Sequence, residues 1–191
     1  MAPYIVNPRT LPISLRHVVA ILASVVLLLG YPSPANAWVT DSTCRWTYSG
    51  NVYLYYEWGP EIDYTAVPAD LSWRSAFQYA AADWSATPTK LYVVSGGSDL
   101  NFDTYYALDG TRGKMALMQW TAPANCLKMF PRGNRAYYRS LYEAEHTANH
   151  EIGHGLPLAH SQYNNALMWD AYNAVGVPQT DDINGVNWMY P

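Results

Sequence analysis

The stretch HEIGHGLPLAH, residues 150 to 160, constrains this chain more than any other part of its sequence. Residues four apart on an α-helix lie one above the other on the same face. His150 and His154 can therefore point both imidazole rings at one ion if the segment is helical. The residues from Tyr138 to Gly155 favour that, because they are rich in helix formers and contain no breaker before the glycines. We predict a long helix over 138–155 that carries a pair of metal ligands.

A third ligand must come from outside this helix, and His160, six residues beyond His154, is the candidate. Catalytic zinc commonly takes three protein ligands and leaves a fourth position for water. Zinc lowers the pKa of such a water to about 7, and Glu151, next to His150, could accept its proton during attack on a carbonyl. The pattern predicts peptide-bond hydrolysis with Zn²⁺ as cofactor, His150, His154 and His160 as metal ligands, and Glu151 as general base.

Two alternatives to this interpretation need weighing. The pattern HExxH is short and also occurs in helices whose histidines are ordinary polar residues. Against that, all the histidines after residue 37 fall within fifteen residues, which a metal explains better. The other alternative pairs His146 with His150, four residues later. Thr147 would then stand where the general base belongs, so we expect His146 to support the ligands from outside or to lie at the surface.

The first 37 residues predict an export signal. Two arginines precede an apolar run over 18–30, and SPANA, ending at Ala37, supplies the small residues that a signal peptidase recognises. An uncleaved membrane anchor is the alternative, but the run is shorter than the roughly 20 residues that span a bilayer. We therefore predict a signal peptide at 1–37, a catalytic domain at 38–191, and a secreted, extracellular protein without stable membrane association.

The size and charge of the predicted mature chain narrow its partners. A chain of 154 residues from Trp38 onward suits one domain. Of the 11 Lys and Arg, two lie before residue 38, so nine remain against 15 Asp and Glu, and the formal charge is −6. A surface of this sign is unsuited to a phosphate backbone, so we expect no nucleic-acid partner.

Cys44 and Cys126 are the two cysteines of the chain. An oxidising compartment permits a disulfide between them. They are too few and too far apart for a cysteine zinc site, and a bridge that closes so long a loop would stabilise the domain by roughly 2–4 kcal/mol. We predict a structural disulfide.

Hydrophobic patterning predicts an α+β domain in which strands come first and the motif helix comes late. Residues 70–86 show helical spacing of apolar side chains, and 96–113 are predicted to be a loop. Pro131 and Gly133 are expected to break the chain, and Thr180 to cap a short last helix. The predicted strands are 51–58, 91–95, 115–120 and 126–130.

The region from His150 to Tyr190 resembles the metzincin metallopeptidases, in particular matrixin-like secreted members. Their pattern is H-E-x-x-H-x-x-G-x-x-H followed by a Met-turn. Here Ser161 follows the third histidine, ALM ends at Met168, and DDINGV resembles the start of the matrixin C-terminal helix. The resemblance implies a zincin/metzincin-like domain with a twisted mixed sheet, a long active-site helix, a Met-turn at Met168 and a short C-terminal helix.

The resemblance also implies a zinc endopeptidase with a protein or peptide substrate, and we expect the protein to be a monomer. An extended substrate would pair with an edge strand, for which MALMQW is the candidate, and a side-chain pocket would lie beside the metal. Tyr172 matches the tyrosine of the family's pocket wall, whereas Asp170 stands where the family has proline. The alternative function is a catalytically inactive zincin-fold protein that binds a protein or cell-wall ligand through aromatic residues.

Pro157 departs from the family pattern, which has glycine there. Proline holds φ near −65° and has no N–H, so it is unsuited to a left-handed turn. We expect Gly155 to take the left-handed position instead, the helix to end early, and His160 still to reach the zinc. Calcium is a second candidate cofactor, at the loop that carries Asp99, Asp103 and Asp109, although a solvated turn also explains such acids.

Overall fold

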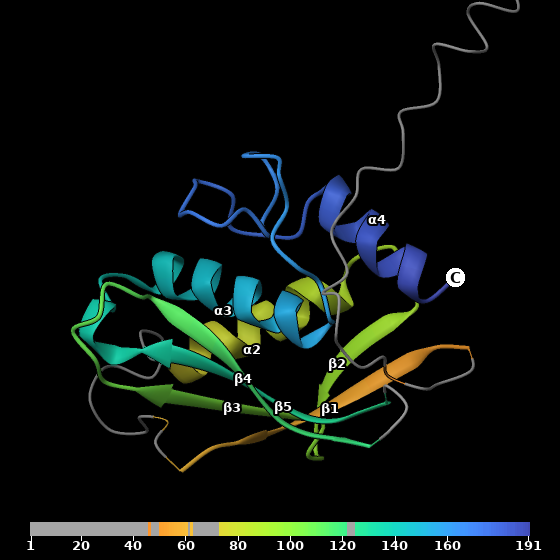
Figure 1. Cartoon of the computed structure of the whole chain (residues 1–191), viewed down its shortest axis with the longest axis horizontal. Helices are drawn as coiled ribbons and strands as arrows, with labels where there is room; N and C mark the ends of the chain where they lie inside the picture. The colour runs from red at the N-terminus through yellow and green to blue at the C-terminus, as the bar shows by residue number, and fades with distance from the viewer. Residues whose placement is uncertain (1–45, 47–49, 61, 63–72, 122–124) are drawn as a thin grey trace, which may run out of the picture. The chain divides into compact units, whose positions relative to one another are not determined.

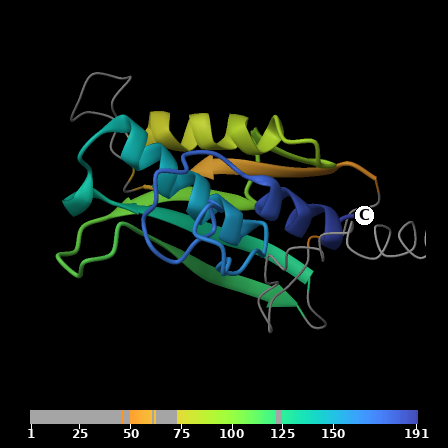
Figure 2. The ribbon, with the colours of Figure 1, turned by 90° about the horizontal axis from the view of Figure 1, so that it is seen from above.

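A five-stranded sheet with helices on one of its faces makes up the described part of the chain (Figures 1 and 2). The computed structural model describes residues 46, 50–60, 62, 73–121 and 125–191. All of them belong to one compact unit, Ala35–Pro191. The predicted signal peptide and Cys44 lie outside the described residues, so export and the disulfide stay predictions.

The sheet is mixed and mostly parallel. Its spatial order is β2-β1-β3-β5-β4, and only the β4–β5 pair among these is antiparallel. β4, which contains the segment MALMQW, therefore lies at an edge, as an exposed pairing strand must. The strands are β1 (Val52–Trp58), β2 (Leu91–Ser95), β3 (Leu100–Tyr105), β4 (Gly113–Thr121) and β5 (Asn125–Asn134).

Two helices, α2 (Trp73–Ser85) and α3 (Leu141–Gly155), lie side by side on the same face of the sheet (Figure 2). Aromatic side chains hold these layers together. The ring of Phe77 on α2 stacks on Phe102 of β3 with centroids 4.8 Å apart. The fully buried Trp84 of α2 donates its indole N–H to the carbonyl oxygen of Asn149 on α3 at 2.9 Å. The core thus positions α3 from its apolar side and leaves its polar side for the site.

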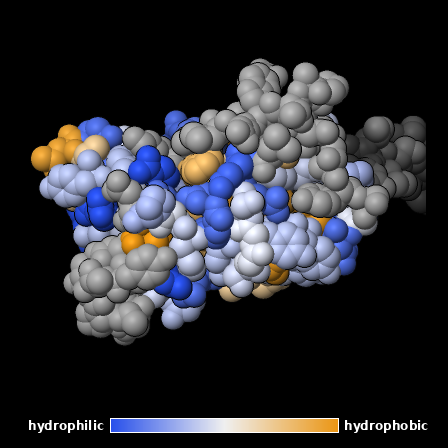
Figure 3. Space-filling view, turned by 90° about the horizontal axis from the view of Figure 1, so that it is seen from below, coloured by the Kyte–Doolittle hydropathy of each residue, from blue (hydrophilic) through white to orange (hydrophobic). Residues whose placement is uncertain are grey.

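The opposite face of the sheet carries polar and amphipathic side chains. β1 alternates, so that Val52, Leu54 and Tyr56 are buried while Tyr53 and Tyr55 are exposed. Where the described residues show in Figure 3, this face is mostly hydrophilic. The tyrosines of β1 therefore divide between core and surface according to strand periodicity.

The expected loop over 96–113 is wrong in its first half, because β3 occupies Leu100–Tyr105. Every residue of β3 is buried, including polar ones that a loop would expose. Their polar groups find partners on neighbouring strands: Asn101 donates to Glu57 of β1 at 3.1 Å. β3 is buried because it lies between two parallel neighbours, although its sequence lacks the hydrophobic run that usually marks a central strand.

The expected break at Pro131 and Gly133 is also wrong, because β5 continues to Asn134. The ladder between β3 and β5 pairs Leu100 with Met129 and resumes with Asp103 and Arg132. Pro131 lies in the interval between those pairs, and it has no N–H to donate. The strand therefore accommodates the proline where the parallel ladder has a gap.

The helix ends differ from the predictions by a few residues. α3 begins at Leu141 rather than Tyr138, because the side chain of Ser140 accepts from the N–H of Glu143 at 3.2 Å and caps the helix. The last helix, α4 (Thr180–Met189), has Gln179 rather than Thr180 as its N-cap residue. No helix in the described part of the chain has the length and apolar character needed to cross a bilayer.

Candidate metal centre

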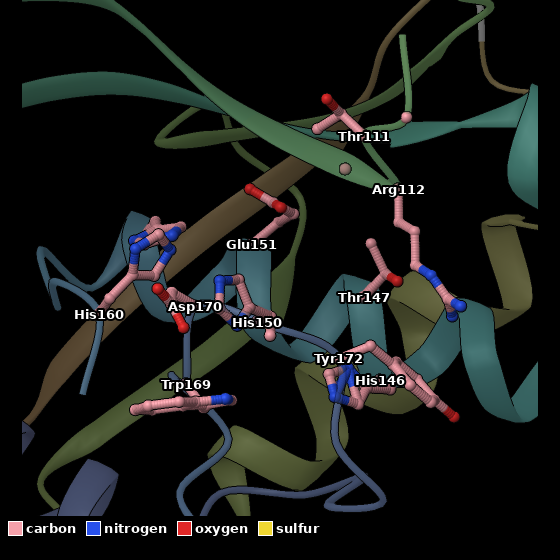
Figure 4. A pocket seen from close by; sticks show the side chains of 14 residues that line it. Thr111, Arg112, His146, Thr147, His150, Glu151, His160, Trp169, Asp170 and Tyr172 are labelled. Carbon is pink, nitrogen blue, oxygen red and sulfur yellow. The ribbon is translucent and has the colours of Figure 1, made fainter. Parts of the chain in front are cut away.

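Three imidazole rings meet at the end of α3. His150 and His154 come from successive turns of the helix, and His160 comes from the segment after it (Figure 4). One nitrogen of each ring lies within 4.8 Å of the corresponding nitrogens of the others. The ring centroids are 4.8, 5.2 and 4.9 Å apart. The sequence-predicted histidines are therefore brought together around one point.

Backbone carbonyl groups orient the two helical histidines. Nδ1 of His150 lies 2.9 Å from the carbonyl oxygen of Leu167, and Nδ1 of His154 lies 2.8 Å from that of Leu158. A carbonyl only accepts, so each Nδ1 carries the proton and each Nε2 keeps its lone pair. Burial lowers the pKa of His150 to about 3 and that of His154 to about 4. Both rings are neutral at pH 7, the form that binds a metal.

Glu151 lies beside the histidines with its carboxyl group almost wholly out of solvent (Figure 4). Its side chain is 5% exposed, and Oε2 has no hydrogen-bond partner within the described residues. Burial raises the pKa of Glu151 to about 8. A cation nearby would favour the carboxylate and lower that pKa. A buried, unpaired carboxyl group next to three converging imidazoles is a donor set that fits zinc and a general base.

The turn after α3 places Pro157, not Gly155, in the left-handed region. Pro157 has φ of 23°, and Gly155 is not among the residues with positive φ. Leu158 donates its N–H to Gly153 at 3.0 Å, a six-residue closure typical of a Schellman motif. The prediction that Gly155 would take this role is wrong, because the closure requires the left-handed residue directly before Leu158. The chain nevertheless brings His160 to the other two rings.

Replacing Pro157 by glycine is expected to stabilise the protein. A proline ring at positive φ is strained, and glycine there relieves a penalty of about 1–3 kcal/mol while adding about 1 kcal/mol of unfolded-chain entropy. We expect a net gain of up to about 2 kcal/mol in the free energy of unfolding, measured with urea. Pro60, an exposed proline without positive φ, is the matched control, and Pro60→Gly should instead destabilise. A destabilised Pro157→Gly variant would contradict this account.

The segment after His160 is tied to the rest of the site by hydrogen bonds. Ser161 donates its N–H to the carbonyl oxygen of Met168 at 2.7 Å and its hydroxyl to Asp181 at 2.5 Å. Asp182 accepts from the N–H groups of Leu167 and Met168 at 2.9 and 3.0 Å. The first residues of α4 thus hold the turn at Met168, which is fully buried.

Met168 supports the helix from below. A side chain on Gly153 would collide with its sulfur, because a Cβ built there lies 2.2 Å from Sδ. The close approach places the turn at Met168 directly against the helix that carries His150 and His154. The residue predicted as the Met-turn therefore packs against α3 at Gly153, which precedes His154 in the sequence.

A cavity of about 690 Å³ opens over the histidines. Glu151 and the three histidines line it at one end, and Tyr172, the residue predicted for the substrate pocket, lines it at the other. Asp170 also lines the cavity and is exposed. Gly113, the first residue of the edge strand β4, also lines the cavity.

The sequence matches a known family over most of its length. Residues 41–191 match the family described as matrixin. The chain belongs to the matrixin family of zinc metallopeptidases. A solved structure described as the GM1-bound form of the ECX AB5 holotoxin is also similar, with a TM-score of 0.54 and 15% sequence identity over 72% of this chain and 80% of that chain. At that identity the likeness shows the fold alone.

Membership of the matrixin family confirms the predicted resemblance, and it implies a metzincin fold, zinc as the metal and peptides as substrates. The helices and mixed sheet agree with such a fold. The roles of individual residues are inferred from the geometry of this chain.

His146 is neither a metal ligand in this geometry nor a surface residue. It is 4% exposed, and its Nε2 lies 3.2 Å from Oδ1 of Asn173. Its ring packs on Tyr172 with centroids 4.7 Å apart. In this matrixin, His146 therefore forms part of the pocket wall next to the helix.

Gly113 was missed by sequence reasoning, although it borders the general-base candidate. A Cβ at Gly113 would lie 2.7 Å from Oε1 of Glu151 and 2.6 Å from Cγ2 of Thr147. The first residue of β4 therefore has to be small for α3 and the edge strand to approach so closely. A glycine that opens the predicted edge strand was the available signal.

Replacing Gly113 by alanine is expected to lower kcat about 10- to 100-fold, because displacing a catalytic group by about 1 Å costs that much. Zinc content, measured by mass spectrometry of metals, should not change. Adding Thr147→Ser removes the methyl group that lies 2.6 Å from the new Cβ. The double variant should recover part of the activity, and unchanged kcat in Gly113→Ala would refute the role of this contact.

The acids of the predicted calcium site do not form a cluster of metal ligands in the described part of the chain. The group there that could hold an ion is the three histidines. Asp99 accepts from the N–H of Tyr55 at 2.8 Å, and Asp109 accepts from that of Thr111 at 3.0 Å. Asp103 accepts from the adjacent N–H of Thr104. These acids organise turns and strand ends, and calcium binding stays an untested prediction.

Proposed function

We propose that this matrixin is a secreted zinc endopeptidase in which His150, His154 and His160 hold the metal and Glu151 is the general base. One observation supports this proposal most directly. Three imidazole nitrogens converge within 4.8 Å of one another beside a buried carboxyl group, and all four side chains line one cavity. Zinc held there would activate a water molecule and polarise the carbonyl group of the substrate.

The residues of the chain support the remaining steps of hydrolysis. Glu151 would take a proton from the attacking water and return it to the leaving amine. Its burial favours the protonated form it must hold between those steps, since burial raises its pKa to about 8. Leu158 and Leu167, through their carbonyl groups, keep the imidazoles of His154 and His150 in the orientation that ligation requires.

The cavity and the edge strand support an extended peptide as the substrate. Among the strands that the structure describes, β4 has one neighbour in the sheet, so its other side can pair with a peptide strand. Gly113, at the start of β4, lies against Glu151. A peptide paired with β4 would thus bring a backbone carbonyl past the general base.

The test is zinc content together with cleavage of casein. The full chain is produced in a secreting host, and the exported protein is assayed as purified, after chelation, and after zinc is restored. We expect one zinc per chain, cleavage that chelation abolishes and zinc restores, and a mature product that begins at Trp38. Zinc retention without cleavage by the unmodified protein would instead favour an inactive ligand-binding protein, and an intracellular product would refute secretion.

A further inference from the structure

Arg112 is a cation at the end of the cavity away from His160 (Figure 4). It precedes β4, and its guanidinium group lies 4.1 Å from the centroid of the Tyr172 ring. In Figure 4 Asp170 lies on the side of His150 and His160, whereas Arg112 reaches toward Tyr172 and His146. Both ends line the same cavity. The pocket beyond the metal site is therefore bordered by a positive charge.

The backbone of Arg112 is held firmly by β5. Its carbonyl oxygen accepts from the N–H of Asn134 at 2.7 Å. The side chain of Asn134, which is fully buried, donates to the carbonyl oxygen of Thr111 at 2.8 Å and lies 3.2 Å from Asp109. The arginine is thus presented from a fixed segment and not from a free loop.

The guanidinium group retains hydrogen-bonding capacity. Among the described residues, its hydrogen bond runs from Nη1 to Oε2 of Glu143 at 3.3 Å, longer than most charge-assisted bonds. The two side chains are 30% and 25% exposed, and ion pairs of that kind contribute about 0–1 kcal/mol. A guanidinium group has five N–H donors, and this bond uses one of them. One edge of Arg112 faces Glu143, which leaves donors for a second carboxylate.

The surroundings of Arg112 favour an acidic partner over a basic one. His146 lies on Tyr172 and adds no charge at pH 7, because burial, and then the charge of Arg112, lower its pKa to about 4. The described residues that line the cavity include one arginine, Arg112, and no lysine. A lysine or arginine side chain of a substrate would therefore meet a like charge at this end of the cavity. A leucine would partly desolvate the guanidinium without offering it a hydrogen-bond acceptor.

The position of the pocket indicates which substrate residue it receives. Antiparallel pairing with β4 is the more stable arrangement per residue. In that arrangement the peptide runs opposite to β4, so the residue after the bond at Glu151 lies toward Arg112, which precedes Gly113. The side chain that enters the pocket then belongs to the residue on the leaving-amine side.

We propose that Arg112 makes this pocket a subsite for a carboxylate, so that the protein cleaves peptide bonds that precede glutamate or aspartate. The proposal rests on the proposed function, and it adds the class of substrate. Two in-plane N–H groups of Arg112 would bind the carboxylate while Tyr172 holds the guanidinium from its face.

The first test measures binding without catalysis. The Glu151→Gln protein, loaded with zinc, is titrated with fluorescent peptides that differ only in the residue after the target bond, which is Glu, Gln, Leu or Lys. We expect the Glu peptide to bind about 10-fold or more tightly than the Gln peptide. Arg112→Gln, added to this protein, should abolish that difference. Equal binding of the Glu and Gln peptides, or a difference that survives Arg112→Gln, would overturn the proposal.

Arg139 provides the matched control, because it is exposed and does not line the cavity. Arg139→Gln removes the same charge from the protein and should keep the Glu preference. Glu143→Gln frees Arg112 from its ion pair and should increase the preference. Zinc content and thermal unfolding of each variant show whether it is folded, and a carboxylate that binds only through zinc would prefer Glu equally in the Arg112→Gln protein.

The second test maps cleavage sites in casein by mass spectrometry. We expect acidic residues to be enriched directly after the cleaved bonds, and Arg112→Gln to remove the enrichment. Cleavage with no acidic enrichment would overturn the subsite but leave the endopeptidase standing. No cleavage of any peptide, with the binding preference intact, would overturn the endopeptidase and leave the carboxylate subsite standing.

Discussion

Replacing Glu151 by glutamine is expected to lower kcat by about 10²- to 10⁴-fold, the usual contribution of a general base. Glutamine has nearly the same shape but cannot accept the proton from water. Glu151 is not in the histidine cluster that could hold the metal, so the variant should keep its zinc. Activity is measured with a quenched peptide substrate, and bound metal by mass spectrometry.

Glu151→Asp distinguishes the effect of moving the carboxylate from the effect of removing it. Glu151→Asp keeps a carboxylate but withdraws it by one methylene group, so it should lose less activity than the glutamine variant and lose it in kcat. A Glu151→Gln protein with full activity would refute the role of this residue. Loss of zinc in Glu151→Gln would show instead that the carboxyl group helps to hold the metal.

Glu151→Gln is also expected to change the free energy of unfolding of the metal-free protein. Burial raises the pKa of Glu151 from 4.5 to about 8. The protonated acid is favoured in the folded state, so its contribution is fully present below pH 4.5 and is lost as the pH rises to about 8. The metal-free unmodified protein should therefore lose stability relative to Glu151→Gln over this interval. Parallel urea titrations at pH 4.5 and 8.5 check the sign, and a difference independent of pH would contradict it.

Asp182→Ala is expected to have the largest effect on folding. The carboxylate is fully buried and accepts from three backbone N–H groups, those of Leu167, Met168 and Gln179, at 2.9, 3.0 and 2.8 Å. Alanine would leave these donors without partners, at a cost on the order of 3–5 kcal/mol in the free energy of unfolding. Urea denaturation of the zinc-loaded protein measures this loss.

Zinc affinity should fall together with stability in Asp182→Ala. The carbonyl oxygen of Leu167 orients His150, and the N–H of the same residue is held by Asp182. Loss of such an outer contact commonly weakens metal binding by about 10- to 100-fold. Asn184→Ala, at an exposed position of the same helix, is the matched control and should change neither quantity. Normal zinc affinity in a destabilised Asp182→Ala protein would separate the turn at Met168 from the metal site.

The histidine pair and the general base were predictable because their geometry is local. One helix of known period places His150 and His154 on one face and Glu151 beside them. The strands Val52–Trp58 and Leu91–Ser95 were also predicted almost to the residue, since both are rich in the β-branched and aromatic residues that favour strands. These features depend on neighbours in the sequence, which can be read without the fold.

β3 and the end of β5 were not predictable in this way. Their polar residues and Pro131 argue against strands locally, and only pairing with distant strands makes them so. Parallel pairing is non-local and leaves little trace in a short window of sequence. The same reason hid Arg112 and Gly113, whose importance comes from α3 and from the segment around Tyr172.

The turn at Pro157 shows most clearly which features the local sequence determines and which the tertiary structure determines. By itself the sequence determined the metal-binding residue types, their helical spacing and the matrixin pattern, because bond geometry and helix period act over a few residues. The tertiary structure decided that Pro157 takes a left-handed conformation. Hydrogen bonds from Leu158 to Gly153, from His154 to Leu158 and from Ser161 to Met168 close the segment on both sides. Together these contacts hold the segment in place despite the strain at Pro157, and they bring His160 to the site.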